Sequence, residues 1–169
     1  MDKFLEQKDW EPLLELLRLE VQEYGGLYNL LDRQQKEIFE RDPEAVLITN
    51  EEIETYTAAM GELRKQREEM VESIGQSCGC EPKLALRKMM PHFPDFIHPL
   101  LEALMDEINQ MVTRTRRKAR QNFLLLSRTM ELTQETMRAL QPENYTKTYS
   151  KKGKVGVNQR MPSRYKAFV

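Results

Sequence analysis

Apolar residues recur at alternating intervals of three and four residues along three long stretches of this chain. A period of 3.5 residues is typical of helices that pack against one another along a continuous seam, as in a coiled coil. The first stretch therefore predicts a long helix that faces other helices, with seam positions Leu14, Leu17, Val21, Tyr24, Tyr28, Leu31, Gln35 and Ile38.

The first helix should end just before Pro43, because proline keeps the residue that precedes it out of the helical conformation. Asp42 can then cap a second helix in which Pro43 takes the first position. The second seam keeps the same spacing, so we expect one helix from about Pro43 to about Gly75. The Gly25–Gly26 pair is a site for a kink in the first helix, which the strong surrounding seam is expected to override.

The segment "GQSCGCEPK" breaks the helical pattern, and a short helix is expected to follow it with Pro82 at its first position. The next segment, "PHFPDFIHP", holds three prolines in nine residues, which predicts an irregular connector. A third long helix should then run from about Ile97 or Pro99 to Leu140.

The middle of the third helix is strongly basic. Its seam turns polar at Thr115, Lys118 and Asn122, and "TRTRRKARQ" supplies a run of cations: Arg114, Arg116, Arg117, Lys118 and Arg120. Residues 1–80 carry a net charge of -10, whereas residues 141–169 carry +6. The basic run therefore splays from the bundle, pairs with the acidic first two helices or forms a basic interaction face.

These features predict an all-α fold: an elongated antiparallel helical bundle or coiled coil of three long helices plus a short helix, with a flexible C-terminal tail. We expect residues 1–140 to form the bundle and residues 141–169 to form the tail. Ordering a backbone residue costs about 1–2 kcal/mol, and burying a large apolar side chain returns about 1.5–3 kcal/mol. With eight large apolar residues among 29, the tail should become ordered only on a partner.

Such a tail predicts a clamp for a partner helix, with the end of the third helix supplying the groove. The predicted partner-binding residues combine that helix end with the tail: Leu125, Thr129, Leu132, Thr136, Met137 and Leu140, together with Tyr145, Tyr149, Val155 and Val157. The alternative is a solvated basic tail without a binding role.

The sequence argues against an enzyme, a metal site or a cofactor. It has no G-x-x-x-x-G-K-[ST] phosphate loop, no G-x-S-x-G elbow and no H-E-x-x-H pair. Cys78 and Cys80 cannot complete a four-ligand zinc site, so we expect reduced thiols in a turn. Asp95 and His98 have a di-iron spacing without the second motif that such a site requires. No signal peptide or apolar run of membrane-spanning length is present, which predicts a cytoplasmic protein.

Several segments resemble the FlgN-type flagellar export chaperones. The stretch from Trp10 to Val71 looks like the N-terminal part of that family, with a leucine-rich helix, an aspartate-led turn and a second helix ending in "LRKQREEMV". The segment "RQNFLLLSRTMELTQETMRAL" is similar to the family's late helix, with Asn122 ahead of a leucine run. The segment "TYSKKGKV", with Tyr149 and Gly153, resembles the tyrosine-x-x-x-glycine element that closes the family.

The resemblance implies a cytosolic, non-enzymatic chaperone that holds secreted hook-associated (hook-filament junction) proteins before their export through the flagellar type III apparatus. It implies that the C-terminal region, Gly153 included, binds the terminal helix of the client. It also implies that Tyr149, or the nearby Tyr145, docks at the export gate. Two alternatives stay open: a structural coiled-coil protein that dimerises through its seams, and a nucleic-acid binder that uses the run from Arg114 to Arg120.

Overall fold

A computed structural model of the chain describes residues 5–80 and 85–140, and the backbone of residues 145–149 and 155–159. The chain divides into two compact units, Met1–Phe123 and Leu124–Val169. The predicted all-α helical bundle is confirmed. The elements are, in order, α1 (Gln7–Glu40), α2 (Pro43–Ser77), the 3-10 helices η1 (Leu86–His92) and η2 (Asp95–Ile97), α3 (His98–Leu140), and the strands β1 (Tyr145–Tyr149) and β2 (Val155–Gln159).

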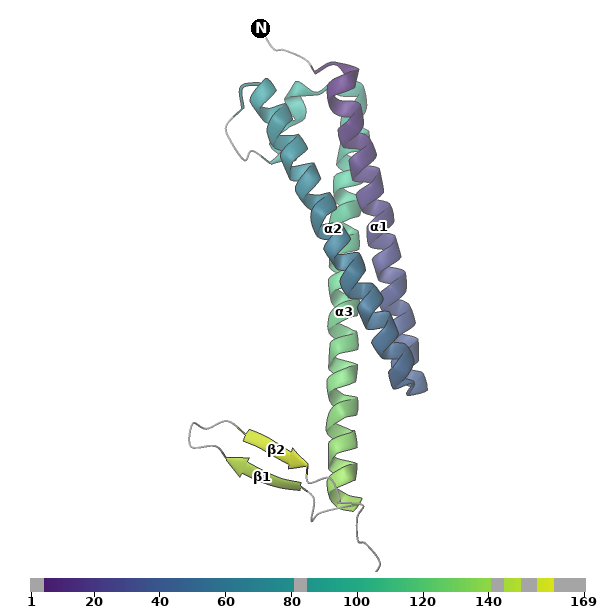
Figure 1. The fold of residues 1–169 in the computed structure, drawn as a ribbon. Coiled ribbons are helices and arrows are strands. Elements are labelled where there is room, and N and C mark those ends of the chain that lie inside the picture. Colours follow the sequence, from purple (N-terminus) through teal and green to yellow (C-terminus); the bar gives the residue numbers. More distant parts are fainter. Residues whose placement is uncertain (1–4, 81–84, 141–144, 150–154, 160–169) are drawn as a thin grey trace, which may run out of the picture. The chain divides into compact units, whose positions relative to one another are not determined.

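The first unit is a bundle in which α1 and α2 lie beside the first part of α3 (Figure 1). Contacts between side chains show that α2 runs antiparallel to α1, whereas α3 runs parallel to α1. The pairs that establish these directions are Tyr24–Arg64 and Arg33–Glu52 between α1 and α2, and Tyr28–Lys118 and Gln34–Asn122 between α1 and α3.

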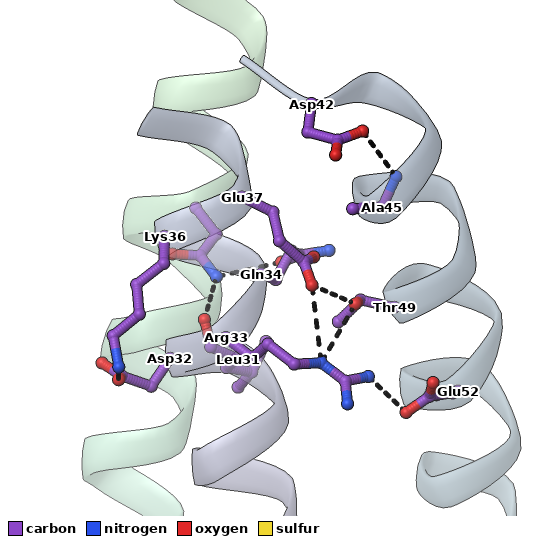
Figure 2. A network of polar contacts seen from close by, with 11 residues as sticks. Leu31, Asp32, Arg33, Gln34, Lys36, Glu37, Asp42, Ala45, Thr49 and Glu52 are labelled. Atoms are coloured by element: carbon purple, nitrogen blue, oxygen red, sulfur yellow. Dashed lines mark hydrogen bonds and ion pairs between the residues drawn. The ribbon is translucent and has the colours of Figure 1, made fainter. Parts of the chain in front are cut away.

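The predicted cap between the first two helices is confirmed. The Asp42 side chain accepts a hydrogen bond from the backbone N–H of Ala45 at 3.0 Å, and a proline opens α2. Close to this turn, the buried Thr49 hydroxyl accepts a hydrogen bond from Arg33 and donates one to Glu37 (Figure 2). Thr49 is a polar residue of the second seam, and both hydrogen bonds of its hydroxyl go to side chains of α1. These bonds fix the alignment of α2 along α1.

The centre of the core lies where the two 3-10 helices meet the long helices. The side chains that are buried to 3% exposure or less there are Leu13, Leu17, Met89, Phe93, Ile97 and Leu101. The backbone N–H of Leu5 also donates to the carbonyl of His92, at 3.2 Å, so the start of the described chain contacts η1. The connector thus contributes to the core and does more than link α2 to α3.

The prediction of an irregular connector is wrong for most of its length. The backbone N–H groups of Phe93 and Ile97 donate to the carbonyls of Met90 and Pro94, and α3 then begins at His98. Pro94 precedes η2 and Pro99 is the second residue of α3, positions at which no helical bond from the backbone N–H is needed, whereas Pro91 lies inside η1 and cannot donate one. The predicted short helix is the 3-10 helix η1, and its predicted first residue, Pro82, lies outside the described residues.

The helix α1 passes through Gly25 and Gly26 without a break, as the seam predicted. The two glycines nevertheless differ in their surroundings. A Cβ atom at Gly25 would meet nothing within 4 Å, whereas one at Gly26 would collide with the ring and hydroxyl of Tyr56 from α2. A hydrogen bond to Glu23 raises the pKa of Tyr56 to about 12 and holds that hydroxyl in place. Gly26 therefore allows α2 to pack closely.

We expect Gly25→Ala to stabilise the protein by about 0.5–1 kcal/mol, because alanine loses less backbone entropy in a helix. Gly26→Ala should instead destabilise it by about 1–2 kcal/mol, because overpacking against Tyr56 exceeds the same helix-propensity gain. Urea unfolding of the two variants measures both changes. Two stabilised variants would contradict the close packing of Tyr56 on Gly26.

Glu20 is a buried carboxylate in the first unit. Its exposed fraction is 2%, and one of its oxygens lies 3.3 Å from Nη1 of Arg67. Burial raises the pKa of this carboxyl above its ordinary value, and the positive charges of Arg67 and Arg64 oppose that shift. The folded protein therefore binds the proton more tightly than the unfolded chain does.

Because its pKa is raised, the contribution of Glu20 to stability is largest below the ordinary carboxyl pKa of 4.5 and is lost as the pH rises through the folded-state pKa. The unfolding free energy of the native protein should thus fall across this window relative to that of Glu20→Gln, which does not titrate. Urea unfolding at a series of pH values tests this. A difference between the two proteins that rises with pH would show that the ion pair with Arg67 outweighs burial.

The polar middle of the third seam packs against α1. Nζ of Lys118 lies 2.6 Å from a carboxylate oxygen of Asp32 and 2.7 Å from Oε1 of Gln35, and it lies over the ring of Tyr28. Asn122 is also buried and bonds to α1. Of the three interpretations of the basic run, pairing with the acidic helices holds for Lys118.

Candidate partner-binding surface

The end of α3, from residue 124 to residue 140, presents large apolar side chains to solvent in the second unit. Leu132, Met137 and Leu140 have exposed fractions of 48%, 42% and 73%, and Met130 has 62%. Leu125 is half-buried. Apolar side chains exposed in a row on one helix are typical of an interaction site.

Charged residues are confined to one side of this helical segment. At about 100° per residue, the charged positions fall within an arc of roughly a quarter of the circumference. They are Arg128, Glu131, Glu135 and Arg138. The half of the circumference that faces away from this arc carries no charge between residues 125 and 140, and consists of Leu125, Leu126, Thr129, Met130, Leu132, Thr133, Thr136, Met137 and Leu140. We call these nine residues the uncharged face.

The threonines on the uncharged face do not need a partner for their hydroxyl groups. Thr129 donates to the carbonyl of Leu125 at 2.9 Å, Thr133 to that of Thr129 at 2.9 Å, and Thr136 to that of Leu132 at 2.8 Å. Each hydroxyl is thereby satisfied within its own helix. The threonines can therefore meet an apolar partner without leaving an unpaired polar group.

The second unit also contains an antiparallel hairpin formed by β1 and β2, with Tyr149 paired to Val155 and Lys147 paired to Val157. Residues at alternate positions of a strand belong to one face, and directly paired residues share it. The register therefore assigns Tyr145, Tyr149, Val155 and Val157 to the same face. Gly153, between the strands, lies outside the described residues.

This hairpin was not predicted from the sequence. A comparison of side-chain burial with backbone entropy leaves out the hydrogen bonds of a local ladder. Tyrosine, threonine and valine favour strands, and they occupy most positions of β1 and β2. The predicted division of the chain at residue 140 stays a prediction, and so does the binding role of the named residues.

The structure shows which predicted residues come together. All six predicted helix positions, from Leu125 to Leu140, lie on the uncharged face. The predicted set of partner-binding residues omitted Leu126, Met130 and Thr133. The position of the charged residues around the helix was the signal that would have found all three.

No group of three or more histidine, cysteine, aspartate or glutamate side chains in the described residues is arranged to hold a metal ion. Cys78 and Cys80 lie at the turn after α2 and are not joined in a disulfide, and Sγ of Cys80 lies 3.4 Å from Nε2 of His92. The second connector histidine, His98, bonds to the carbonyl of Phe93. None of the described helices combines the length and the apolar character that crossing a membrane requires.

Comparison with known proteins identifies one family. The family described as FlgN protein matches residues 10–156, which include α1 from Trp10 onward, all of α2 and α3, and the first strand. No curated protein and no solved structure matches the chain.

Proposed function

The chain belongs to the FlgN family of flagellar chaperones, and we propose that it binds the terminal helix of a hook-filament junction protein. In this proposal it keeps that secreted protein soluble in the cytoplasm and delivers it to the flagellar type III export apparatus. The family membership supports the general role, and the uncharged face of α3 supports the mode of binding.

The uncharged face is the observation that carries the proposal. Leu132, Met137 and Leu140 are exposed, and the neighbouring threonines are satisfied within the helix. An amphipathic client helix can lay its apolar stripe along such a face, with its own charged side left in water. The face of the hairpin that includes Tyr149 and Val155 would add a second set of contacts.

The position of Tyr149 suggests a further role in delivery. It matches the tyrosine that the family resemblance associates with docking at the export gate, and it ends β1. We propose that the hairpin presents this tyrosine to the gate after the client helix has bound.

Deletion of residues 142–169 should abolish binding of a purified hook-filament junction protein, while helix content and melting stay nearly unchanged. The reason is that the described core lies between residues 5 and 123, within the first unit. Calorimetric titration measures binding, and circular dichroism measures helix content and melting. Retained binding would show that the client does not need residues 142–169, whereas a loss of folding would show that the deleted segment is structural.

A further inference from the structure

Four arginines on α3 in the first unit are exposed and make no ion pair or hydrogen bond with the described residues: Arg114, Arg116, Arg117 and Arg120. Lys118, in the middle of the same run, differs from them because Asp32 and Gln35 bind its ammonium group. Lys118 is thus a structural cation that pairs within the bundle, whereas the four arginines can pair with a partner. We call the four arginines the basic face.

A pocket of about 440 Å³ adjoins the basic face and lies between α1 and α3. It is lined by Tyr28, Met111, Arg114, Arg117, Lys118 and Gln121. Tyr28 and Met111 give it an aromatic and a thioether wall, and two of the available guanidinium groups lie beside them. Its lining therefore suits an apolar side chain whose neighbours are anionic.

We propose that the basic face binds an acidic helical segment of a partner protein, with one apolar side chain of that segment seated in the pocket. Arg114 and Arg117 are three residues apart, and Arg116 and Arg120 are four apart, so each pair spans about 4.5–6 Å along α3. Carboxylates three or four residues apart on a partner helix have the same spacing. The proposal does not depend on the uncharged face, which lies in the second unit.

Charge distribution favours an acidic protein segment over a nucleic acid. The basic face extends only about 9 Å along the helix axis, and duplex DNA carries one charge per about 1.7 Å. A nucleic acid would therefore extend beyond the arginines, near residues 1–80 with their net charge of -10. A short acidic segment can end where the basic face ends.

The test uses the full chain and a fluorescein-labelled helical peptide of about fourteen residues, with glutamates three and four apart and a single leucine. Fluorescence anisotropy should show binding that weakens between about 50 and about 300 mM NaCl. Replacing the glutamates by glutamine should remove binding. Replacing the leucine by serine should weaken binding about tenfold, because the pocket loses its apolar occupant.

Two double variants of the protein test whether the peptide binds at the basic face. Arg114→Gln combined with Arg117→Gln should weaken binding about tenfold, since two charge pairs are lost. The matched control is Arg18→Gln combined with Lys65→Gln, which removes the same charge at exposed positions outside the basic face. This control should bind within about twofold of the native protein.

Equal weakening in the two double variants would overturn the proposal, because net charge alone would then explain binding. Equal binding of the glutamate and glutamine peptides would also overturn it. A single-stranded oligonucleotide of the same charge serves as the competing probe. If it bound more tightly than the peptide and lost affinity with Arg114→Gln and Arg117→Gln, the basic face would be a nucleic-acid site instead.

Discussion

Leu132→Asp is expected to weaken binding of a hook-filament junction protein by at least about 100-fold. Leu132 lies midway along the length of the uncharged face, and its side chain is half exposed in the free protein. The substitution removes an apolar contact and obliges a carboxylate to lose water inside the interface, which together cost about 3 kcal/mol or more. The melting temperature should hardly change, because the site is exposed before the client binds. Calorimetric titration gives the affinity.

Gln134→Asp is the matched control for this experiment. It adds the same charge two residues away, at an exposed position on the side of the helix that faces away from Leu132. The client should bind this variant within about twofold of the native affinity. If both variants lost binding equally, a general effect of negative charge on α3 would replace the uncharged face as the explanation.

Asn122→Ala is expected to lower the free energy of unfolding by about 2–4 kcal/mol. The Asn122 side chain is 1% exposed, and its Nδ2 donates to the carbonyl of Leu31 at 2.7 Å and to Oε1 of Gln34 at 2.9 Å. Alanine would leave the amide oxygen of Gln34 buried without this donor and would create a small cavity. Thermal melting should show a decrease of roughly 5–10 °C.

Gln121→Ala provides the comparison at the neighbouring position. Gln121 is exposed on the same turn of α3, so its replacement should change the unfolding free energy by no more than about 0.5 kcal/mol. A small effect of Asn122→Ala would mean that water replaces its two hydrogen bonds to α1. The buried amide would then contribute little to holding α3 against α1.

The long helices could be predicted from the sequence because their signals are local. The spacing of apolar residues defined three helices, and Asp42 followed by Pro43 defined the turn between the first two. The structure places the end of the third helix at Leu140, as predicted. In each case the deciding interaction lies within a few residues of the signal.

Features that depend on contacts between distant residues could not be predicted in the same way. From the sequence alone, Gly26 is a possible kink in α1, whereas the structure shows that Tyr56 of α2 packs against it. From the sequence alone, the charge of Lys118 opposes packing of the third seam, whereas the structure shows its Nζ 2.6 Å from a carboxylate oxygen of Asp32. The candidate site was predicted in part: Leu132 belongs to the third seam, whereas Met130 lies at the opposite edge of the uncharged face and outside that seam.

If a client binds as proposed, the threonines of the uncharged face affect the free-energy cost of its release. Thr129, Thr133 and Thr136 offer methyl groups where leucines would offer larger side chains, and their hydroxyls stay engaged with the helix backbone whether or not a client is present. In the proposed binding mode, release of a client would therefore expose less apolar area than an all-leucine face would, and it would break no hydrogen bond of these residues.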